Sequence, residues 1–313
     1  MEDNKTVFYQ IIDELCKEKN INQELLSFNW IRELKKDGKI KHLIRYQFDL
    51  NSANSFRIAG DKYATYAVLS KNNIPIIEHR MIFNPETRED YFEKSQLDEA
   101  ISLLEKNKKV IIKANQSSKG KHVVLCESEN EIRNSINKFL NEEKDTISAC
   151  PYIDIEYEYR AVYLCGEILY IYKKEKPYII GNGKNTIIEL INEKFGEENT
   201  LDILRELDLN YIPNENEKIT VSWKHNLCNG ANPVIISPDD LYYEDVKSIA
   251  INSGKAIDIN FATIDIALTS EKKLMVVEVN ASVCMDKFAI LTPNGYSIAK
   301  EIYSKAIDEM FNY

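Results

Sequence analysis

The sequence has few of the residues that build zinc sites or disulfide frameworks, and no segment suited to a membrane. Only 4 histidines occur in 313 residues, and no two are close together, so zinc chemistry is not expected. The 6 cysteines follow no CxxC spacing and mostly lie in apolar runs, which favours reduced, buried thiols. Nowhere do about 18 apolar residues run together, so we expect no membrane span. The acidic, amphipathic start, MEDNKTVFYQIIDEL, does not resemble a secretory signal, so we expect a cytoplasmic protein.

Glycine-rich nucleotide motifs and an excess of positive charge are also missing. The 10 glycines form neither a Walker A sequence nor GxGxxG. A net charge of -10 argues against nucleic acid or an anionic membrane as a partner. The composition that is present, 44% hydrophobic and 29% charged residues, is typical of a globular protein. A chain of 313 residues can form one unit of two or three subdomains.

Hydrophobic periodicity and turn signals predict helices and strands mixed along the whole chain, which indicates an α+β fold. Helices are expected at 5–19, 61–72, from 95, at 128–143, from 186, at 239–253 and from 296. Strands are expected at 74–83, 110–114, 123–127, 156–165, 167–175, 218–223, 261–268 and 273–282. The spacing of a capping box marks the start of some of these helices, with Ser95 and Asp98, Ser128 and Glu131, and Thr186 and Glu189.

The last two predicted strands bring three oxygen-bearing side chains together. Glu278 and Asn280 are two residues apart, so both side chains leave the same face of an extended strand. The polar stretch 269–272 can fold the preceding strand back, which sets Asp265 roughly opposite Glu278. An ordinary half-exposed hairpin is the alternative, but these acids interrupt apolar runs, where unpaired carboxylates are costly. Two carboxylates and an amide oxygen suit Mg²⁺, so the trio predicts a magnesium site.

The segment VIIKANQSSKGKHVVL, residues 110–125, places Lys113 at the end of an apolar strand. A lysine that points inward from such a strand needs an anionic partner, and a nucleotide phosphate would supply one. The loop 117–122 that follows contains Ser117, Ser118 and Gly120. Its backbone N–H groups could close over phosphate oxygens, although many hairpins carry similar polar turns.

Taken in order, these segments resemble an ATP-grasp ligase domain. IDIAL and VVEVNAS, at 264–268 and 276–282, are similar to the end of that fold, and 110–125 to its phosphate flap. The segment AGDKYATYAVLSKNNIPIIEH, at 59–79, is similar to its entry segment. PYIIGNGKNTIIELI and WKHNLCNGANP, which start at 177 and 223, are similar to the subgroup of cyanophycin synthetase, bifunctional glutathione synthetase and RimK-type ligases. The resemblance covers roughly residues 55–311.

The resemblance implies an ATP-grasp fold in which two α+β subdomains grip ATP between them. The expected boundaries are 1–55 for a reduced N-terminal region, 56–150 for the small subdomain with the flap, and 151–313 for the C-terminal subdomain with the metal site. The first 55 residues are too short for the full N-terminal domain of many relatives. Either that domain is reduced here, or a partner chain completes the site.

The resemblance also implies roles for single residues. Backbone groups near Tyr152 and Ile153 would meet adenine, and Glu158 the ribose. The phosphates would be held by Lys62, Lys113, Ser117, Ser118, Gly120 and Asn226. Asp265, Glu278 and Asn280 would hold two Mg²⁺ ions, with Mn²⁺ as an alternative, and the catalytic candidates that supply positive charge are Arg160, Lys173 and Lys224. Judged by residue type alone, Glu158 and Arg160 also fit a solvated strand face, and Lys62 a solvated helix start.

The implied activity is ATP-dependent carboxylate–amine ligation through an acyl phosphate, on an amino acid or a small peptide. Its partners would be a small-molecule carboxylate and amine, or a peptide, and a homodimer is one option for its assembly. The loop 281–287 touches the acceptor substrate in most relatives but lacks their Pro or Gly here, so the substrate is not transferred. Three alternatives stay open, which are a macrocyclase acting on a ribosomal precursor peptide, a small-molecule kinase and a non-catalytic binding module.

Overall fold

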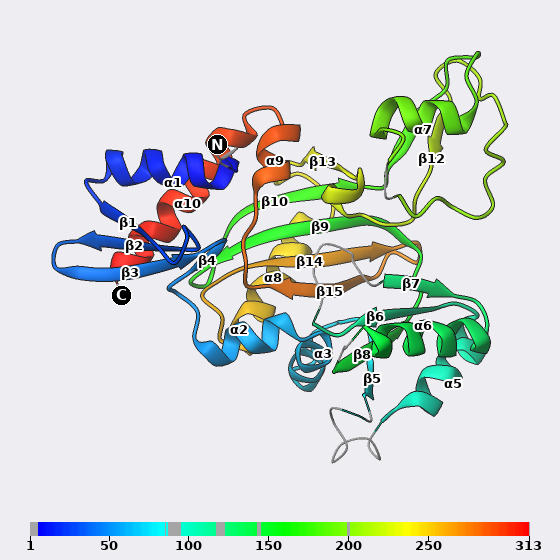
Figure 1. Ribbon diagram of the computed structural model, residues 1–313, viewed down its shortest axis with the longest axis horizontal. Helices are drawn as coiled ribbons and strands as arrows, with labels where there is room; N and C mark the ends of the chain where they lie inside the picture. The colour runs from blue at the N-terminus through cyan, green and yellow to red at the C-terminus, as the bar shows by residue number, and fades with distance from the viewer. Residues whose placement is uncertain are drawn as a thin grey trace.

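The computed structural model describes residues 6–84, 86, 95–116, 123–142, 145–198 and 201–312. At its centre lies a five-stranded antiparallel sheet in the order β13-β10-β9-β14-β15 (Figure 1). Its strands are β9 (Ile155–Leu164), β10 (Glu167–Glu175), β13 (Asn232–Ile235), β14 (Phe261–Thr269) and β15 (Leu274–Asn280). A turn at Gly166, where φ is 96°, joins β9 to β10 and confirms the hairpin predicted there. Helix α8 (Tyr243–Ile257) covers one face of this sheet over a core that includes Tyr159, Ile264 and Val279.

A second antiparallel sheet, in the order β5-β8-β6-β7, forms a smaller lobe that we call the lid lobe. Its strands are β5 (Arg80–Phe83), β6 (Val110–Ala114), β7 (Val123–Cys126) and β8 (Thr146–Pro151). Helices α5 (Leu97–Asn107) and α6 (Glu129–Asn141) cover this sheet over a separate core that includes Ile112, Ile136 and Phe139. Helices α2 (Ala53–Gly60) and α3 (Lys62–Lys71) precede the lid lobe and pack against the central sheet and α8. The two lobes confirm the predicted α+β fold class.

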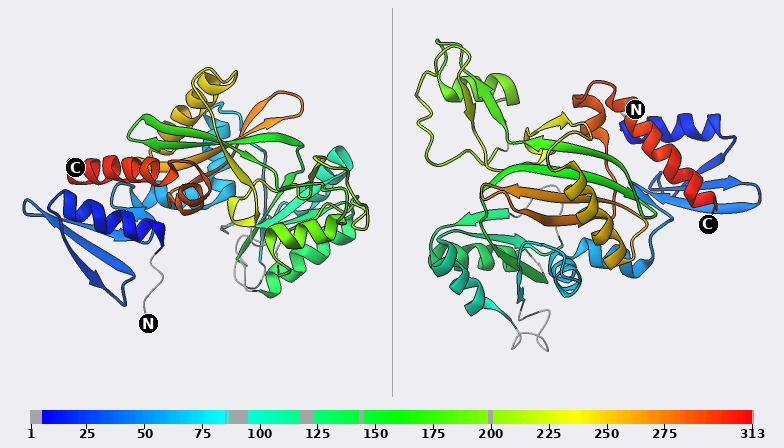
Figure 2. Two further views of the ribbon diagram at one scale, coloured as in Figure 1. Left: turned by 90° about the horizontal axis from the view of Figure 1, so that it is seen from above. Right: turned by 180° about the vertical axis from the view of Figure 1, so that it is seen from behind.

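The first 50 residues contain more structure than the sequence predicted. After the predicted helix, α1 (Val7–Glu18), the chain forms a four-stranded antiparallel sheet of β1 (Asn22–Leu26), β2 (Ile31–Lys36), β3 (Lys39–Ile44) and β4 (Gln47–Phe48). These strands were missed because they are mostly polar and exposed, with few fully buried positions such as Leu34 and Leu43. We call residues 6–50 the N-terminal unit; it packs against α9 (Asp286–Leu291) and α10 (Gly295–Asn312), as Figure 2 shows.

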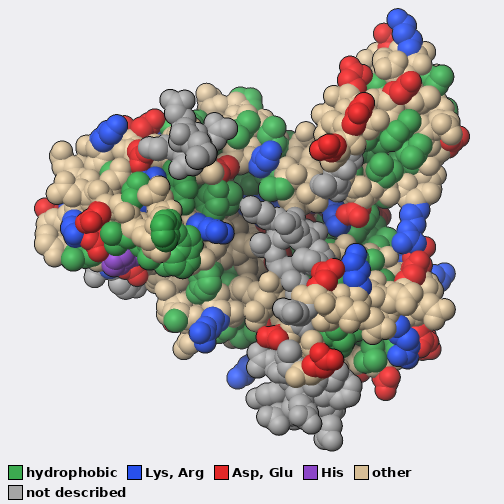
Figure 3. All heavy atoms as spheres, in the orientation of Figure 1, with side chains coloured by type: hydrophobic (Ala, Val, Ile, Leu, Met, Phe, Trp, Pro, Cys, Tyr) green, Lys and Arg blue, Asp and Glu red, His purple; other side chains and the backbone are tan. Residues whose placement is uncertain are grey.

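The described residues of 178–221, which are 178–198 and 201–221, form an arm that projects from the central sheet (Figure 3). It contains β11 (Tyr178–Ile180), α7 (Ile187–Phe195) and β12 (Lys218–Thr220) around its own small core, which includes Ile179, Ile191 and Val221. A 3-10 turn, η1 (Leu227–Asn229), follows the arm and leads into β13. Across the described ranges, no helix combines the length and apolar character needed to cross a membrane.

The predicted helix starts have mixed outcomes. Thr186 makes a complete capping box with Glu189, and the Ser128 hydroxyl accepts a hydrogen bond from the Glu131 amide at 3.3 Å. The box predicted at Ser95 is wrong, because α5 begins at Leu97 with no side-chain cap. The Ser95 hydroxyl instead accepts a hydrogen bond from the Phe83 amide at 3.4 Å. The strand predicted at 74–83 is also shorter than expected, since only Arg80–Phe83 forms β5.

Candidate active site

One row of four side chains crosses the central sheet. The strand registers place Tyr172 beside Arg160, Arg160 beside Asp265, and Asp265 beside Glu278. Neighbouring residues such as Tyr159 and Ile264 point into the core under α8, so this row lies on the sheet's other face. We call this the open face. The prediction that Asp265 lies opposite Glu278 is confirmed.

An irregularity in the β14–β15 pair brings Glu278 and Asn280 onto the open face. Val276 and Val279 are both fully buried in the core under α8, although they are three positions apart and a regular strand would turn them to opposite faces. The register shifts between Asp265 and Ile266, so β15 contains one extra residue at this point. Such a bulge changes which way the following side chains point and is frequent beside active sites. Glu278 and Asn280 then lie on one side, where the Asn280 amide donates to Glu278 Oε1 at 3.0 Å.

Asp265 is held by two cations. Its side chain is only 1% exposed, and Arg160 binds it bidentately through Nε–Oδ1 and Nη2–Oδ2 contacts of 2.7 and 2.6 Å. Lys174 Nζ adds a third hydrogen bond to Oδ2 at 3.1 Å. Burial disfavours the charged carboxylate, but Arg160 and Lys174 outweigh it and hold the pKa of Asp265 well below its usual range. Asp265 is therefore a carboxylate at neutral pH.

Lys174 also pairs with Glu158 on the same open face. The two residues are 3% and 9% exposed and lie opposite each other on β10 and β9. Burial raises the pKa of Glu158 to about 7, and the nearby carboxylates of Asp265 and Glu278 add to this effect against the influence of Lys174. Burial and Arg160 disfavour the Lys174 charge, but Asp265 and Glu158 outweigh them and raise its pKa.

A second group of cations lies where the lid lobe meets the central sheet. The Lys113 side chain on β6 is 8% exposed, and within the described ranges its ammonium group has no hydrogen-bond or ion-pair partner. Lys62 donates to the Asn115 carbonyl at 3.2 Å. Burial lowers the pKa of Lys62 to about 8; Glu278 opposes this shift and Lys113 adds to it. His79 is buried beside these lysines, and burial holds its pKa well below its usual value. Lys62 and Lys113 therefore bring positive charge to the junction of the two lobes.

An apolar cluster joins the two lobes at the predicted adenine site. Tyr152 and Ile153 pack with Ile111, Cys150 and Val277, while the rings of Tyr152 and Trp223 are 6.0 Å apart. The Tyr152 amide donates to the Lys109 carbonyl at 3.0 Å, so this donor already has a hydrogen-bond partner within the protein. The backbone groups of Ile153 make no hydrogen bond to any described residue.

Two of the three predicted catalytic residues lie away from the row. Lys173 is on the face that α8 covers, where its ammonium binds Asp240 Oδ2 at 2.5 Å and lies over the Tyr157 and Tyr159 rings. Lys224 pairs with Asp202 and donates to the Val123 carbonyl at 3.3 Å, which links the end of the arm to the lid lobe. Of the three predicted catalytic residues, Arg160, Lys173 and Lys224, only Arg160 contacts Asp265 directly.

Of the remaining residues predicted to bind phosphate, one lies apart from the row and three fall outside the described residues. Asn226 accepts a hydrogen bond from the Cys228 amide at 2.9 Å and caps η1, and among the described residues it makes no hydrogen bond to the carboxylates of the row. The predicted flap residues Ser117, Ser118 and Gly120 lie outside the described residues.

Sequence reasoning missed Lys174 because of a second bulge. Near the turn, β9 and β10 pair Leu164 with Glu167, and a regular hairpin continued from there would place Lys173 opposite Glu158. The register shifts between Ile168 and Tyr170, so Lys174 takes that position. His225 was also missed; it is buried nearby, and burial together with Lys176 and Lys174 lowers its pKa to about 3.

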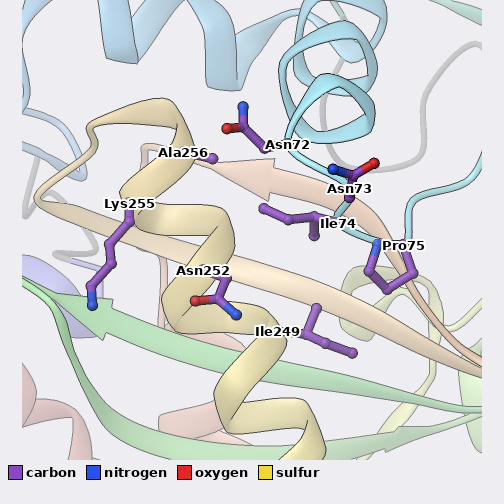
Figure 4. A pocket seen from close by; sticks show the side chains of 8 residues that line it. All are labelled: Asn72, Asn73, Ile74, Pro75, Ile249, Asn252, Lys255 and Ala256. Carbon is purple, nitrogen blue, oxygen red and sulfur yellow. The ribbon is translucent and has the colours of Figure 1, made fainter.

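A pocket of about 390 Å³ lies elsewhere, between the end of α3 and α8 (Figure 4). Its walls include the side chains of Asn72, Asn73 and Asn252, and Lys255 extends away from these asparagines. None of the residues of the row lines it, so this pocket is not part of the candidate site.

A family model of the RimK-like ATP-grasp domain matches residues 59–162 and 222–305, which is more than half of the chain. The chain therefore belongs to the RimK-like ATP-grasp family and has the fold of the ATP-grasp ligases, as the sequence predicted. The model leaves out residues 1–58 and 163–221, which contain the N-terminal unit and the arm. No curated protein sequence matches the chain.

Three solved structures show the same fold. A bifunctional glutathione synthetase from Pasteurella multocida is similar with a TM-score of 0.57 and 16% identity, over 97% of this chain and 45% of that one. A D-alanine–D-alanine ligase from Bacillus anthracis is similar with a TM-score of 0.56 and 16% identity, over 85% of this chain and 70% of that one. D-alanyl-alanine synthetase A from Vibrio cholerae O1 biovar eltor is similar with a TM-score of 0.58 and 11% identity, over 96% of this chain and 92% of that one. The chain thus spans less than half of the glutathione synthetase, and these identities show the fold alone.

Proposed function

We propose that this protein is an ATP-dependent ligase that joins a carboxylate to an amine, with an amino acid or a small peptide as substrate. The observation that carries the proposal is the row of Arg160, Asp265 and Glu278 on the open face, with Lys62 close enough to Glu278 for its pKa to respond. Lysines at one lobe junction can hold the phosphates of a nucleoside triphosphate, while carboxylates there hold the metal ions bound to the same phosphates. The similar ligases of known fold support this reading.

The nucleotide would lie between the lobes. The apolar cluster around Tyr152 and Trp223 suits the adenine ring, and the Ile153 backbone groups are available for hydrogen bonds to its edge. Lys62 and Lys113 would meet the phosphates, since Lys113 is buried, Lys62 is half-buried, and both bring positive charge to the lobe junction. Glu158 keeps its predicted ribose role, with Lys174 fixing its orientation.

The donor set fits magnesium. Asp265, Glu278 and Asn280 offer the hard oxygen atoms that this ion prefers. Asp265 Oδ1 accepts one hydrogen bond, from Arg160 Nε, and Glu278 Oε1 accepts one, from Asn280. A carboxylate oxygen has two lone pairs, so both residues keep capacity for a metal ion. Bound magnesium would neutralise charge on the β- and γ-phosphates.

The reaction has two steps. A carboxylate oxygen of the substrate attacks the γ-phosphorus, the bond to the β–γ bridging oxygen breaks, and ADP leaves. The amine then attacks the carbonyl carbon of the acyl phosphate, orthophosphate leaves, and the amine loses its proton to solvent. Arg160 and Lys174 provide fixed positive charge beside these oxygens. Burial disfavours the Arg160 charge, but Asp265 outweighs it and holds the pKa of Arg160 well above its usual value, so Arg160 stays charged.

The test is a product analysis. The purified protein is incubated with MgATP and pools of amino acids and dipeptides, and ADP, AMP, orthophosphate and new amides are measured. We expect ADP, orthophosphate and an amide, and no AMP. With an ¹⁸O-labelled carboxylate substrate, one labelled oxygen should appear in the released orthophosphate.

Other products would identify other functions. AMP and pyrophosphate would contradict the acyl-phosphate route even if an amide formed. A stable phosphorylated product without an amide would identify a small-molecule kinase. Turnover only with a longer peptide, yielding a side-chain cross-link, would identify the macrocyclase.

A further inference from the structure

The N-terminal unit, which the family model does not match, binds the chain just after β15. Residues 281–285 form the β15–α9 loop, and Asp286 begins α9. The Tyr46 hydroxyl donates to Asp286 Oδ2 at 2.6 Å, and the Phe8 amide donates to Asp286 Oδ1 at 2.8 Å. The Val283 amide donates to the Tyr46 carbonyl at 3.2 Å. Two separate parts of the N-terminal unit therefore meet one carboxylate at the end of this loop.

The inner side of the loop is fixed by α10. The Tyr303 hydroxyl donates to the Val283 carbonyl at 3.0 Å and accepts from the Met285 amide at 2.9 Å. Val283 and Met285 are fully buried, whereas Ser282 and Cys284 between them are half-buried. This alternation continues that of Glu278 and Asn280 on β15, so the loop extends the strand that carries the candidate metal residues.

The bonds to Asp286 are distinct from those that attach the N-terminal unit to α10. Glu14 of α1 accepts hydrogen bonds from Tyr296 at 2.8 Å and Lys300 at 2.7 Å, and Lys19 binds Asp308. These contacts hold the unit in place without touching the loop. The Phe8 amide is one of the unsatisfied donors at the start of α1, and a carboxylate is a favourable partner there. Asp286 thus ties the N-terminal unit to the end of the β15–α9 loop, separately from its contacts with α10.

We propose that Asp286 is a positioning residue that fixes the β15–α9 loop through Tyr46 and Phe8, so that the N-terminal unit controls recognition of the non-nucleotide substrate. Ser282, on the same side of the chain as Asn280, is the residue through which this control reaches the substrate, whereas the Cys284 thiol contacts Tyr46 and belongs to the anchored end of the loop. The substrate part of this inference rests on the proposed ligase function, whereas the loop part rests on the contacts alone.

The experiment compares two tyrosine hydroxyls at the same interface. Tyr46→Phe removes the bond to Asp286, and Tyr296→Phe removes a similar bond to Glu14 on α1 and serves as the matched control. Hydrogen exchange is measured by mass spectrometry on the full chain without added ligand. We expect exchange in peptides covering 280–288 to be about tenfold faster in Tyr46→Phe, as for loss of a hydrogen bond to a charged group, and unchanged in Tyr296→Phe.

Kinetics with the substrate pair from the product screen give the second readout. Tyr46→Phe and Asp286→Ala should raise the KM of the non-nucleotide substrate about tenfold, with kcat and the KM of ATP within twofold of the wild type. Asp286→Asn should recover most of the effect, because its amide oxygen still accepts from Phe8 and its NH₂ group can donate to the Tyr46 oxygen. A purely structural role would lower stability without this KM-specific change.

The outcomes separate the two proposals. Equal exchange in the wild type and Tyr46→Phe, or an equal change in both tyrosine variants, would overturn the positioning role. If calorimetry shows no MgATP binding, the ligase proposal fails, and the exchange comparison alone decides whether Asp286 fixes the loop.

Discussion

Asp265 and Glu278 lie side by side on neighbouring strands, yet their carboxylates differ in how many hydrogen bonds they accept. Asp265 accepts three hydrogen bonds from Arg160 and Lys174, whereas within the described ranges Glu278 accepts a hydrogen bond only from Asn280. Asp265 thus anchors the cations of the row, and Glu278 is the carboxylate most available to a metal ion.

Glu278→Gln should therefore remove turnover while leaving the fold intact. The substitution keeps the shape and takes away one anionic ligand, so we expect ATP-dependent phosphate release to fall by about 100-fold or more. Glu271→Gln is the matched control, since Glu271 lies in the β14–β15 turn and, in the part of the chain that the structure describes, pairs only with the exposed Lys273. Full activity in a folded Glu278→Gln protein would contradict the metal assignment.

The lowered pKa of Lys62 predicts that nucleotide binding depends on pH. Burial lowers its pKa to about 8 in the free protein, so its ammonium group loses its proton as the pH rises through this value. Phosphate binds the charged form, so the affinity for MgATP should fall about tenfold between pH 7 and pH 9, with proton uptake on binding above pH 8. Calorimetry in buffers of different ionisation enthalpy measures both quantities. Lys62→Arg stays charged and should show a flat profile, and a sloped one would mean that another group titrates.

At the scale of the elements, neighbouring lysines of β10 face opposite sides of one sheet. Lys174→Met should leave Glu158 without its buried cation, which typically costs about 3–5 kcal/mol, and should strongly reduce turnover. Lys173→Met removes a partly exposed contact with Asp240, so we expect a loss of about 1 kcal/mol or less and near-normal turnover. Urea unfolding and phosphate release measure the two effects. The opposite ranking would restore the original assignment of Lys173.

Two serines in the lid lobe allow a similar paired comparison, because one caps its helix and the other does not. Ser128→Ala removes the hydroxyl that caps α6 and should lower the free energy of unfolding by about 1 kcal/mol. Ser95 has the same capping-box spacing but does not cap α5, so Ser95→Ala loses only the long hydrogen bond from the Phe83 amide and should cost about 0.5 kcal/mol. Both variants are compared by urea unfolding, and a loss in Ser95→Ala as large as that in Ser128→Ala would contradict this difference between the two helix starts.

Sequence patterns predicted the elements better than their registers. Strong periodicity located α1, β6 and the β14–β15 hairpin, and it placed Asp265 opposite Glu278. The bulge in β10 was not predictable, because one extra residue in a ladder leaves no clear mark in the sequence yet reverses which lysine faces the site. The strands of the N-terminal unit were missed for a different reason, since polar, exposed strands lack the alternation that identifies them.

At the scale of the whole molecule, the hydrophobic cores define what unfolds together. Phe8, Leu34 and Phe48 of the N-terminal unit share one core with Val162 of β9 and Phe261 of β14, so this unit is built onto the central sheet. The arm has a separate core around Ile191, and so does the lid lobe. The N-terminal unit is therefore a structural part of the larger lobe, while the arm is a local folding unit.

Phe8→Ala and Ile191→Ala should show this difference. Each removes a fully buried side chain and should cost about 2–5 kcal/mol locally. Because the core of Phe8 reaches β9 and β14, Phe8→Ala should speed hydrogen exchange in the central sheet as well as in residues 6–50. Ile191→Ala should speed exchange only in the arm, because its core contains residues of 178–221 alone. If Phe8→Ala affected only the N-terminal unit, that unit would fold independently, and its contact with Asp286 would be a docking of two separate bodies.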